Sequence, residues 1–342
     1  MKISPYLRPL VVLLSLGASG SLLQAETLQT PSGERGLRTE ETAEGTCILD
    51  KQGDLLTCWP REQGHITDLR ETTRGWVAAG HSLGFADREL FVIRDFGDGV
   101  ERLAAPEEGE GVRGRPELVT DGARLVGLVW LEGSVQAELE IRAAEWLGGG
   151  WGSTMTVSPK GQGAQLAPAA TVLDDGRWLL LWTAVDGQDD EVMWSLFDRG
   201  AWSSPLRVHE DNVMPDVMPV VVATPKGAIA AWSWLDGRDY RLRTAFFDGS
   251  SWRLDEPYAG RGGLEPHLER ASGVFLLSFK TVEPEAWVAC ELDPWGRLLH
   301  RAAVPRASVA RPTVEFAGNG VAFRWPGSST QLEILATWDA ER

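Results

Sequence analysis

The sequence contains few of the residues that most often carry chemistry. Among its 342 residues are three cysteines, three tyrosines and five histidines, and 33 basic residues stand against 49 acidic ones. No Cys-x-x-Cys motif is present, which excludes the common zinc and dithiol redox sites. The shortage of positive charge disfavours nucleic acid and anionic lipid as partners, because both are negatively charged.

Long apolar runs are missing after the N-terminus. Lys2 and Arg8 precede the apolar residues 9–16, and small residues follow to Ala25, which is the layout of a secretory signal peptide. That run is too short to cross a bilayer, and no later run is long enough. We therefore expect residues 1–25 to be removed on export, giving a periplasmic or secreted chain without membrane insertion. An uncleaved anchor is the alternative, because Leu23 stands where a small residue is preferred.

Two of the three cysteines lie in a predicted hairpin. A turn at Gln52 and Gly53 would place Cys47 directly opposite Cys58, and an oxidising compartment permits a disulfide between them. Cys290 lies in an apolar strand pattern and is predicted to be a buried free thiol.

A pattern of about fifty residues recurs through most of the chain. Each copy has Pro, a short apolar run, a turn, and a second apolar run that ends in Trp or Phe. Five copies begin at Pro116, Pro168, Pro219, Pro266 and Pro312, and a weaker copy has Thr67 in place of Pro. Such self-similarity predicts a repeat fold, because one unit cannot bury its own apolar face.

Each copy divides into four short strands, which is what a β-propeller blade requires. In the third copy these are residues 169–173, 177–182, 191–197 and 202–208. We therefore predict an all-β, six-bladed β-propeller of four-stranded antiparallel blades. The last copy lacks its fourth strand, so the N-terminal hairpin is expected to supply it and close the ring. Seven blades are the alternative. Residues 26–44 are expected to be a flexible leader, and residues 45–342 the propeller domain, as a monomer.

The turns between the third and fourth strands resemble the Asp-box (BNR) repeats of sialidase-type propellers. Residues 195–202 keep the Ser, Asp, Gly and Trp of that motif with altered spacing, and residues 246–252 keep Asp, Gly and Trp. In that family the Asp box is a structural turn on the face opposite the active site. The family's Phe-Arg-Ile-Pro signature is absent, and its nucleophilic tyrosine has no counterpart in the last repeat. The resemblance therefore implies the fold rather than sialidase activity.

The candidate site lies on the face that carries the loops leading into the first strand of each blade. Arg115, Glu265 and Arg311 each directly precede the Pro of their repeat, so they should surround one opening. The other candidate ligand-binding residues on this face are His65, His267, Asp186 and Asp236. The alternative for each of them is an ordinary solvated loop residue.

No metal or other cofactor is predicted. The histidines of this face, which include His81 and His209, show no metal-binding spacing and would form a site only if their loops converge. The acidic residues 186–191 could hold calcium, but they lack EF-hand spacing and are expected to be a solvated turn.

We therefore expect a non-catalytic exported propeller that binds a glycan or a protein partner. The alternative is a carbohydrate-active hydrolase that uses carboxylates of the acidic loops.

Overall fold

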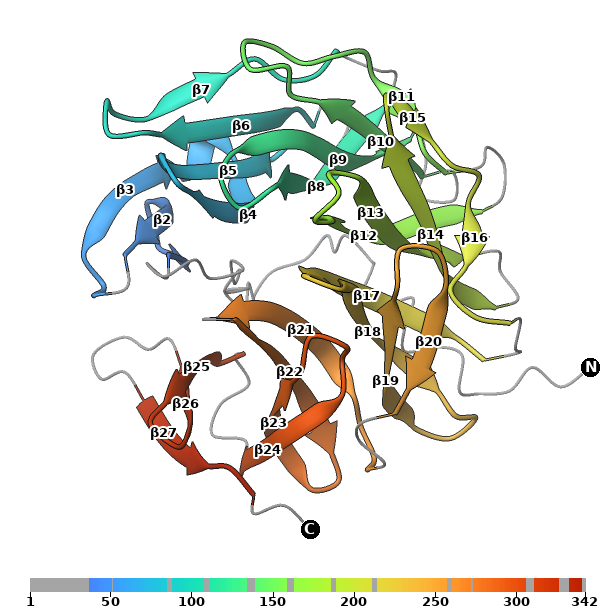
Figure 1. Cartoon of the computed structure of the whole chain (residues 1–342). Coiled ribbons are helices and arrows are strands. Elements are labelled where there is room, and N and C mark those ends of the chain that lie inside the picture. Colours follow the sequence, from blue (N-terminus) through green and yellow to red (C-terminus); the bar gives the residue numbers. More distant parts are fainter. Residues whose placement is uncertain are drawn as a thin grey trace, which may run out of the picture.

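The structure is a computed structural model that describes residues 37–50, 52–84, 88–107, 111–133, 139–158, 163–185, 189–210, 214–256, 260–271, 273–305, 311–325 and 332–339. These residues form seven antiparallel sheets and one short 3-10 helix, η1 (Arg61–Gln63). The sheets follow one another around a common centre in sequence order (Figure 1), so the fold is a seven-bladed β-propeller. Within the described ranges, no helix has the length and apolar character that a membrane crossing requires.

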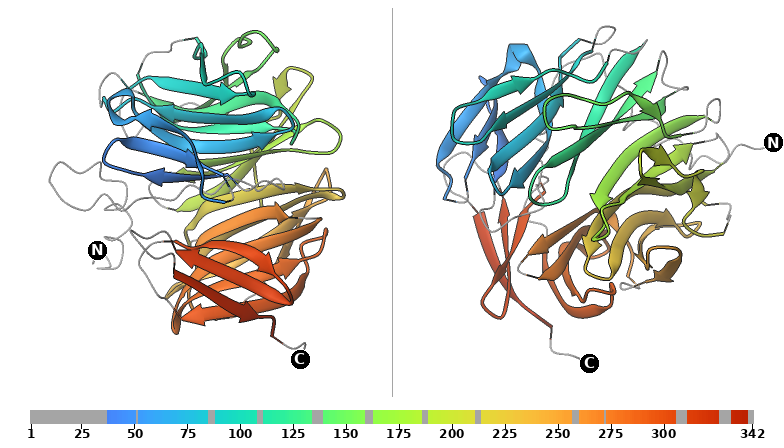
Figure 2. Two further views of the ribbon diagram at one scale, coloured as in Figure 1. Left: turned by 90° about the vertical axis from the view of Figure 1, so that its left-hand side faces the viewer. Right: turned by 45° about the horizontal axis from the view of Figure 1, so that its top comes forward.

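The blades are numbered in chain order, and the first strand of each lies nearest the centre (Figures 1 and 2). Blade 1 contains β1 (Arg38–Glu41), β2 (Gly45–Leu49) and β3 (Leu55–Pro60). Blade 2 contains β4 (His65–Thr72), β5 (Gly75–His81), β6 (Leu90–Asp95) and β7 (Glu101–Leu103). Blade 3 contains β8 (Val112–Thr120), β9 (Leu125–Gly133), β10 (Glu140–Glu145) and β11 (Met155–Thr156).

The later blades repeat this meander. Blade 4 contains β12 (Ala164–Val172), β13 (Trp178–Val185), β14 (Asp190–Asp198), β15 (Ala201–Trp202) and β16 (Leu206–Arg207), the last two pairing with β14 as one interrupted edge strand. Blade 5 contains β17 (Asp216–Thr224), β18 (Gly227–Leu235), β19 (Tyr240–Phe247) and β20 (Trp252–Asp255). Blade 6 contains β21 (Leu264–Ala271), β22 (Val274–Val282), β23 (Glu285–Leu292) and β24 (Leu298–Pro305). Blade 7 contains β25 (Thr313–Ala317), β26 (Gly320–Trp325) and β27 (Leu332–Thr337).

The N-terminal hairpin accounts for the seventh blade. In the described part of the chain its strands β2 and β3 form a three-stranded sheet with β1, and blade 7 is a separate three-stranded sheet. The seven-bladed alternative is therefore the observed one, and the hairpin does not supply the missing strand of the last blade. The added strand is β1, which lies within the residues that we expected to form a flexible leader. The composition of residues 26–44 did not indicate this strand, because β1 has only four residues and only one of them is buried.

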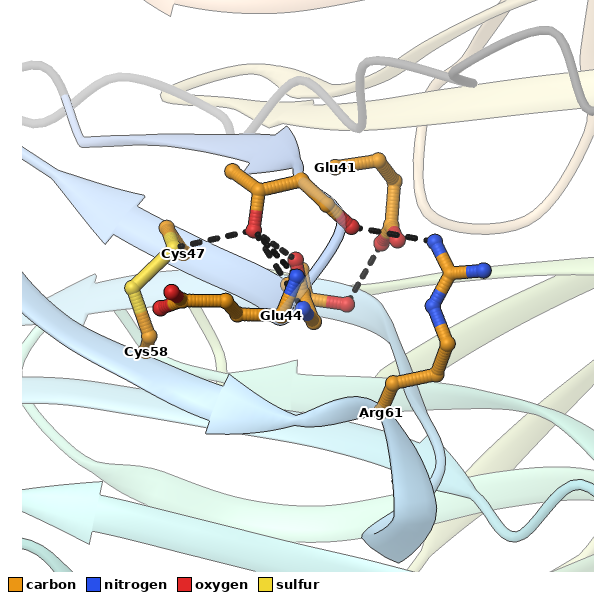
Figure 3. The surroundings of a disulfide bond; sticks show 8 residues. Glu41, Glu44, Cys47, Cys58 and Arg61 are labelled. Atoms are coloured by element: carbon orange, nitrogen blue, oxygen red, sulfur yellow. Dashed lines mark hydrogen bonds between the residues drawn. A yellow bond between two sulfur atoms is a disulfide. The ribbon is translucent and has the colours of Figure 1, made fainter.

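The Cys47–Cys58 disulfide is present in blade 1, as expected (Figure 3). The two residues are direct partners in the register of β2 and β3, with their Cα atoms 3.9 Å apart. The turn is longer than the two residues predicted, because Asp50 and Asp54 close it through a backbone hydrogen bond and a bulge follows Ile48. Cys290 is buried and is not part of a disulfide.

Six clusters of buried apolar side chains hold consecutive blades together, as propeller packing requires. In one of them, Leu181 of β13 and Trp194 of β14 pack with Trp232 of β18, which joins blade 4 to blade 5. In another, Trp59 of β3 stacks on Phe91 of β6 with ring centroids 4.9 Å apart, which joins blade 1 to blade 2.

In blades 3 to 6 the Pro of the repeat lies within the innermost strand rather than at its start, and in blade 7 Pro312 directly precedes β25. In blades 3 to 6 the residue before Pro has a positive φ: Arg115 46°, Ala167 48°, Met218 58° and Glu265 55°. A bulge in the pairing with the second strand accompanies each of these positions. The extra residue of a bulge is not paired with the neighbouring strand. The side chain at this position therefore departs from the regular alternation of the strand.

Candidate functional site

A cavity of about 1110 Å³ occupies the centre of the propeller. Its walls come from the innermost strands β4, β8, β12, β17, β21 and β25. Parts of the wall are apolar, such as Val220 and Val222 of β17, and other parts carry charged side chains. The charged residues form two groups, one where blades 2 and 3 meet and the other on blades 6 and 7.

In the first group, one arginine lies between two carboxylates. Arg70 of β4 makes an ion pair of 2.9 Å with Asp68 and another of 2.6 Å with Glu117 of β8. Burial, with the charge of Asp68 in addition, raises the pKa of Glu117 to about 8. Asp68 also accepts a hydrogen bond of 2.7 Å from the backbone N–H of Leu118. This group ties two blades together, so its charges are already compensated within the protein.

The second group leaves polar atoms without partners. His267 and Glu269 lie on β21, with 3.9 Å between Nε2 of His267 and Oε2 of Glu269. That Nε2 is buried and has no hydrogen-bond partner among the residues that the structure describes. Burial, with the charge of Glu315 on β25 in addition, raises the pKa of Glu269 to about 8. Glu315 itself is paired with Arg324.

Arg311 and Glu265, two of the predicted site residues, belong to the same two blades as this second group. Arg311 precedes β25, and its Nε and Nη2 are buried without a hydrogen-bond partner in the described part of the chain. Burial lowers its pKa to about 10, and the negative charge of Glu265 partly offsets that effect. Glu265 also lies 4.0 Å from Nζ of Lys280.

Arg115 shares the bulge conformation of Glu265 but belongs to blade 3, where its side chain is exposed. It contributes to the positive surroundings of His81, whose pKa is lowered to about 4, chiefly by burial. The structure thus places Arg311 and Glu265 close enough to interact, and Arg115 elsewhere on the ring.

The remaining predicted residues have separate environments. His65 begins β4, and its Nδ1 lies 3.6 Å from a carboxylate oxygen of Glu41 in blade 1. Asp236 closes its own turn by accepting the backbone N–H groups of Arg238 and Asp239 and by pairing with Arg241. The backbone hydrogen bond from Asp239 is the main reason for the lowered pKa of Asp236. Asp186 lies outside the described residues.

One arrangement that the sequence did not predict lies where blades 4 and 5 meet. Glu191 of β14, His209 of the connection after β16 and Asp216 of β17 bring their ligand atoms within 4.8 Å of one another. The sequence showed His209 and the acidic residues on separate loops, and only the packing of β14 against β17 brings them together. The only signal in the sequence was that His209 and the acidic residues 186–191 were assigned to loops on the same face of the propeller.

The segment 246–252, one of the two that resemble an Asp box, forms a turn between β19 and β20. Oδ1 of Asp248 accepts hydrogen bonds from the backbone N–H groups of Ser250 and Ser251. These bonds, chiefly the one from Ser251, lower the pKa of Asp248 to about 2. Trp252 after this turn packs against Phe247 with ring centroids 4.9 Å apart. These contacts fix the edge of the blade and do not face the central cavity.

A scan against protein-family models finds no match for this chain, and neither does a search of the curated proteins. Solved structures do resemble it. Hydrazine synthase from Kuenenia stuttgartiensis matches with a TM-score of 0.59 and 10% identity over 95% of this chain and 99% of that one. The polysaccharide lyase Uly1 matches with a TM-score of 0.58 and 8% identity over 94% and 91%.

A prolyl endopeptidase matches with a TM-score of 0.58 and 12% identity over 92% of this chain, which spans about half, 48%, of that protein. At identities this low, the likeness shows the fold alone. The sialidase-type resemblance is not supported by a family match and stays a prediction. What the comparisons establish is that the chain has the β-propeller fold.

Proposed function

We propose that this chain is an exported, non-catalytic β-propeller that binds a carboxylate-bearing ligand at the entrance to its central cavity. Arg311 is the observation that supports this. Its Nε and Nη2 are buried without a hydrogen-bond partner in the described ranges, and these are the atoms with which arginine grips a carboxylate in two parallel bonds.

The energetics of Arg311 favour a ligand. With a pKa of about 10 the guanidinium remains charged at neutral pH. Buried donor atoms without acceptors cost free energy, and the negative charge of Glu265 offsets only part of the effect of burial on Arg311. A bound carboxylate would supply the missing acceptors.

The central cavity, which is lined by His267 and Glu269 of β21 and by Glu315 of β25, can accommodate a ligand larger than one carboxylate. Its volume of about 1110 Å³ slightly exceeds the roughly 300–1,000 Å³ typical of ligand sites. His267 of the cavity wall offers a buried Nε2 that has no hydrogen-bond partner within the described ranges. An acidic oligosaccharide, or an acidic side chain or C-terminus of a protein partner, has the chemistry that these donors recognise.

Two features support export. The N-terminal residues have the layout of a signal peptide, and blade 1 contains a disulfide, which persists in an oxidising compartment.

Binding of uronate-containing oligosaccharides, their neutral counterparts, and acidic peptides to the purified mature protein would test this proposal. We expect retention of a carboxylate-bearing probe, and at least tenfold weaker binding by Arg311→Gln. Arg199→Gln is the matched control, because Arg199 is an exposed turn residue between β14 and β15. Unchanged binding by Arg311→Gln, together with a large drop in melting temperature, would show that Arg311 is structural.

One observation favours the alternative, a carbohydrate-active hydrolase. Glu269 has a pKa of about 8 and is influenced by a second carboxylate, Glu315. A protonated carboxyl near an ionised one is the arrangement that glycosidases use as acid and base or nucleophile. Turnover of aryl glycosides that Glu269→Gln abolishes would support the hydrolase over the binding protein.

A further inference from the structure

The group where blades 4 and 5 meet combines three buried potential metal ligands. Glu191 is 5% exposed, Asp216 is fully buried, and the side chain of His209 is 8% exposed. Nε2 of His209 lies 3.1 Å from Oδ2 of Asp216. Two ligands of one zinc ion, each about 2.1 Å from the metal, are separated by roughly 3.0–3.4 Å, so this pair already has the required spacing.

The hydrogen bonds of His209 direct its Nδ1 to a backbone carbonyl and its Nε2 to the carboxylate of Asp216. Nδ1 of His209 lies 2.7 Å from the backbone carbonyl oxygen of Glu210. A carbonyl only accepts, so Nδ1 carries a proton there. In a neutral imidazole Nε2 then has a lone pair, which would point at the negatively charged Asp216. A cation between the two removes this repulsion, and metal-bound histidines typically donate their other N–H in this way.

The carboxylate of Asp216 is also held in place. The indole N–H of Trp232 donates to Oδ1 over 2.6 Å, which leaves Oδ2 directed toward His209. The ring of Trp232 lies parallel to the imidazole of His209, with centroids 6.0 Å apart and an interplanar angle of 6°. Ligands whose orientation is fixed by hydrogen bonds are what a metal site requires.

The repeat provides an internal comparison. In blade 4, Gln165 occupies the position equivalent to Asp216, three residues before the repeat's Pro, and accepts the indole N–H of Trp182 over 2.7 Å. An amide therefore suffices to anchor the tryptophan. Blade 5 has a carboxylate instead and adds a histidine and a second carboxylate within 4.8 Å. Anchoring the tryptophan does not account for these additions.

We propose that Glu191, His209 and Asp216 bind one divalent transition-metal ion. One imidazole nitrogen and two carboxylates are the ligand types and the number found in zinc sites that keep a fourth position for water or another ligand. Manganese and iron bind the same types of ligand. Zinc fits three protein ligands better, because its tetrahedral site needs only four ligands in total. The proposal is independent of the ligand proposed for Arg311, which lies in blade 7.

The test uses the mature protein after treatment with EDTA. Zinc titrated by calorimetry should bind with a stoichiometry of one per chain and should raise the melting temperature. Asp216→Asn, Glu191→Gln and His209→Ala should each weaken zinc binding by at least tenfold. Asp216→Asn keeps an acceptor for Trp232, as Gln165 does in blade 4, so that variant should fold. His300→Ala is the control, because His300 lies in blade 6 and stacks on Trp338.

A second readout uses cobalt, which quenches nearby tryptophan fluorescence. Quenching should saturate at one equivalent of cobalt, be reduced in Trp232→Phe and be lost in Asp216→Asn. Phe279 fills the equivalent position of blade 6, so the Trp232→Phe variant should also fold. Absence of saturable zinc binding, or zinc binding that all three ligand substitutions leave unchanged, would overturn the proposal. His209 would then be an imidazolium paired with Asp216.

Discussion

Trp182 donates its indole N–H to Oε1 of Gln165 over 2.7 Å, and both side chains are buried. The same tryptophan position is anchored differently in other blades: by Glu132 for Trp130 and by Asp216 for Trp232. A buried indole without an acceptor costs free energy. Blades 3, 4 and 5 therefore each provide an acceptor of their own, at positions that are not all equivalent, whereas the buried indole nitrogen of Trp325 in blade 7 has no hydrogen-bond partner among the described residues.

This pairing predicts the effect of removing the acceptor. Gln165→Leu should lower the free energy of unfolding by about 1–3 kcal/mol, because it leaves the N–H of Trp182 buried and unsatisfied. Urea denaturation of both single variants and the double variant Gln165→Leu/Trp182→Phe would measure the coupling. The double variant should lose less than the sum of the single changes. Strict additivity would mean that the hydrogen bond contributes nothing to stability.

The cysteines should differ sharply in reactivity. Burial raises the pKa of the Cys290 thiol to about 12, so almost no thiolate forms at neutral pH. In the native protein Cys290 should resist alkylation, and it should react stoichiometrically after denaturation. Cys47→Ala/Cys58→Ala should cost about 2–3 kcal/mol, since the bridge closes a short loop. Peptide mass spectrometry without reduction checks the bridge and the labelling of Cys290, and urea denaturation checks the loss of stability. Labelling of Cys290 in the native protein would contradict its burial.

Stability should depend on pH through Glu269. Its pKa rises from about 4.5 to about 8 on folding, so between these values the native state binds more protons than the unfolded state. The free energy of unfolding should therefore fall as pH rises from about 4.5 to 8. Glu269→Gln should be more stable than the wild type at pH 8 by at least about 1 kcal/mol. Glu333→Gln, which changes an exposed partner of Arg324, is the control. An equal pH dependence in Glu269→Gln and wild type would show that another group titrates.

Truncation of the N-terminus should separate the leader from blade 1. Deleting residues 26–36, which precede the described part of the chain, should leave the melting temperature unchanged. Deleting residues 26–44 removes β1 and should destabilise blade 1. Deleting residues 26–60 should cause aggregation, because it removes Ile48 and Trp59 from the cluster shared with blade 2 and exposes that apolar face. Size-exclusion chromatography and thermal melts distinguish these results. A monomeric, equally stable protein after the longest deletion would show that blade 1 is dispensable.

The sequence by itself determined the repeat, the blade meander and the disulfide. These features depend on local patterns: alternating apolar residues, turn residues at a fixed spacing, and two cysteines on either side of one turn. The four strands predicted in the third copy correspond to β12, β13, β14 and the interrupted edge β15–β16. The tryptophans that end the second apolar run of the repeat pack in the core, with Trp130, Trp182 and Trp232 fully buried.

The blade count and the candidate sites were decided by the tertiary structure. Whether the N-terminal hairpin joins the last blade or stands alone depends on pairing between chain ends, which no local pattern encodes. Residues in equivalent repeat positions also came to differ, since Nε and Nη2 of Arg311 are buried and its guanidinium is influenced by Glu265, while Arg115 is exposed in blade 3. Glu191, His209 and Asp216 meet only because two blades pack face to face. Contacts between blades depend on how the ring closes, and a repeat pattern carries no information about that.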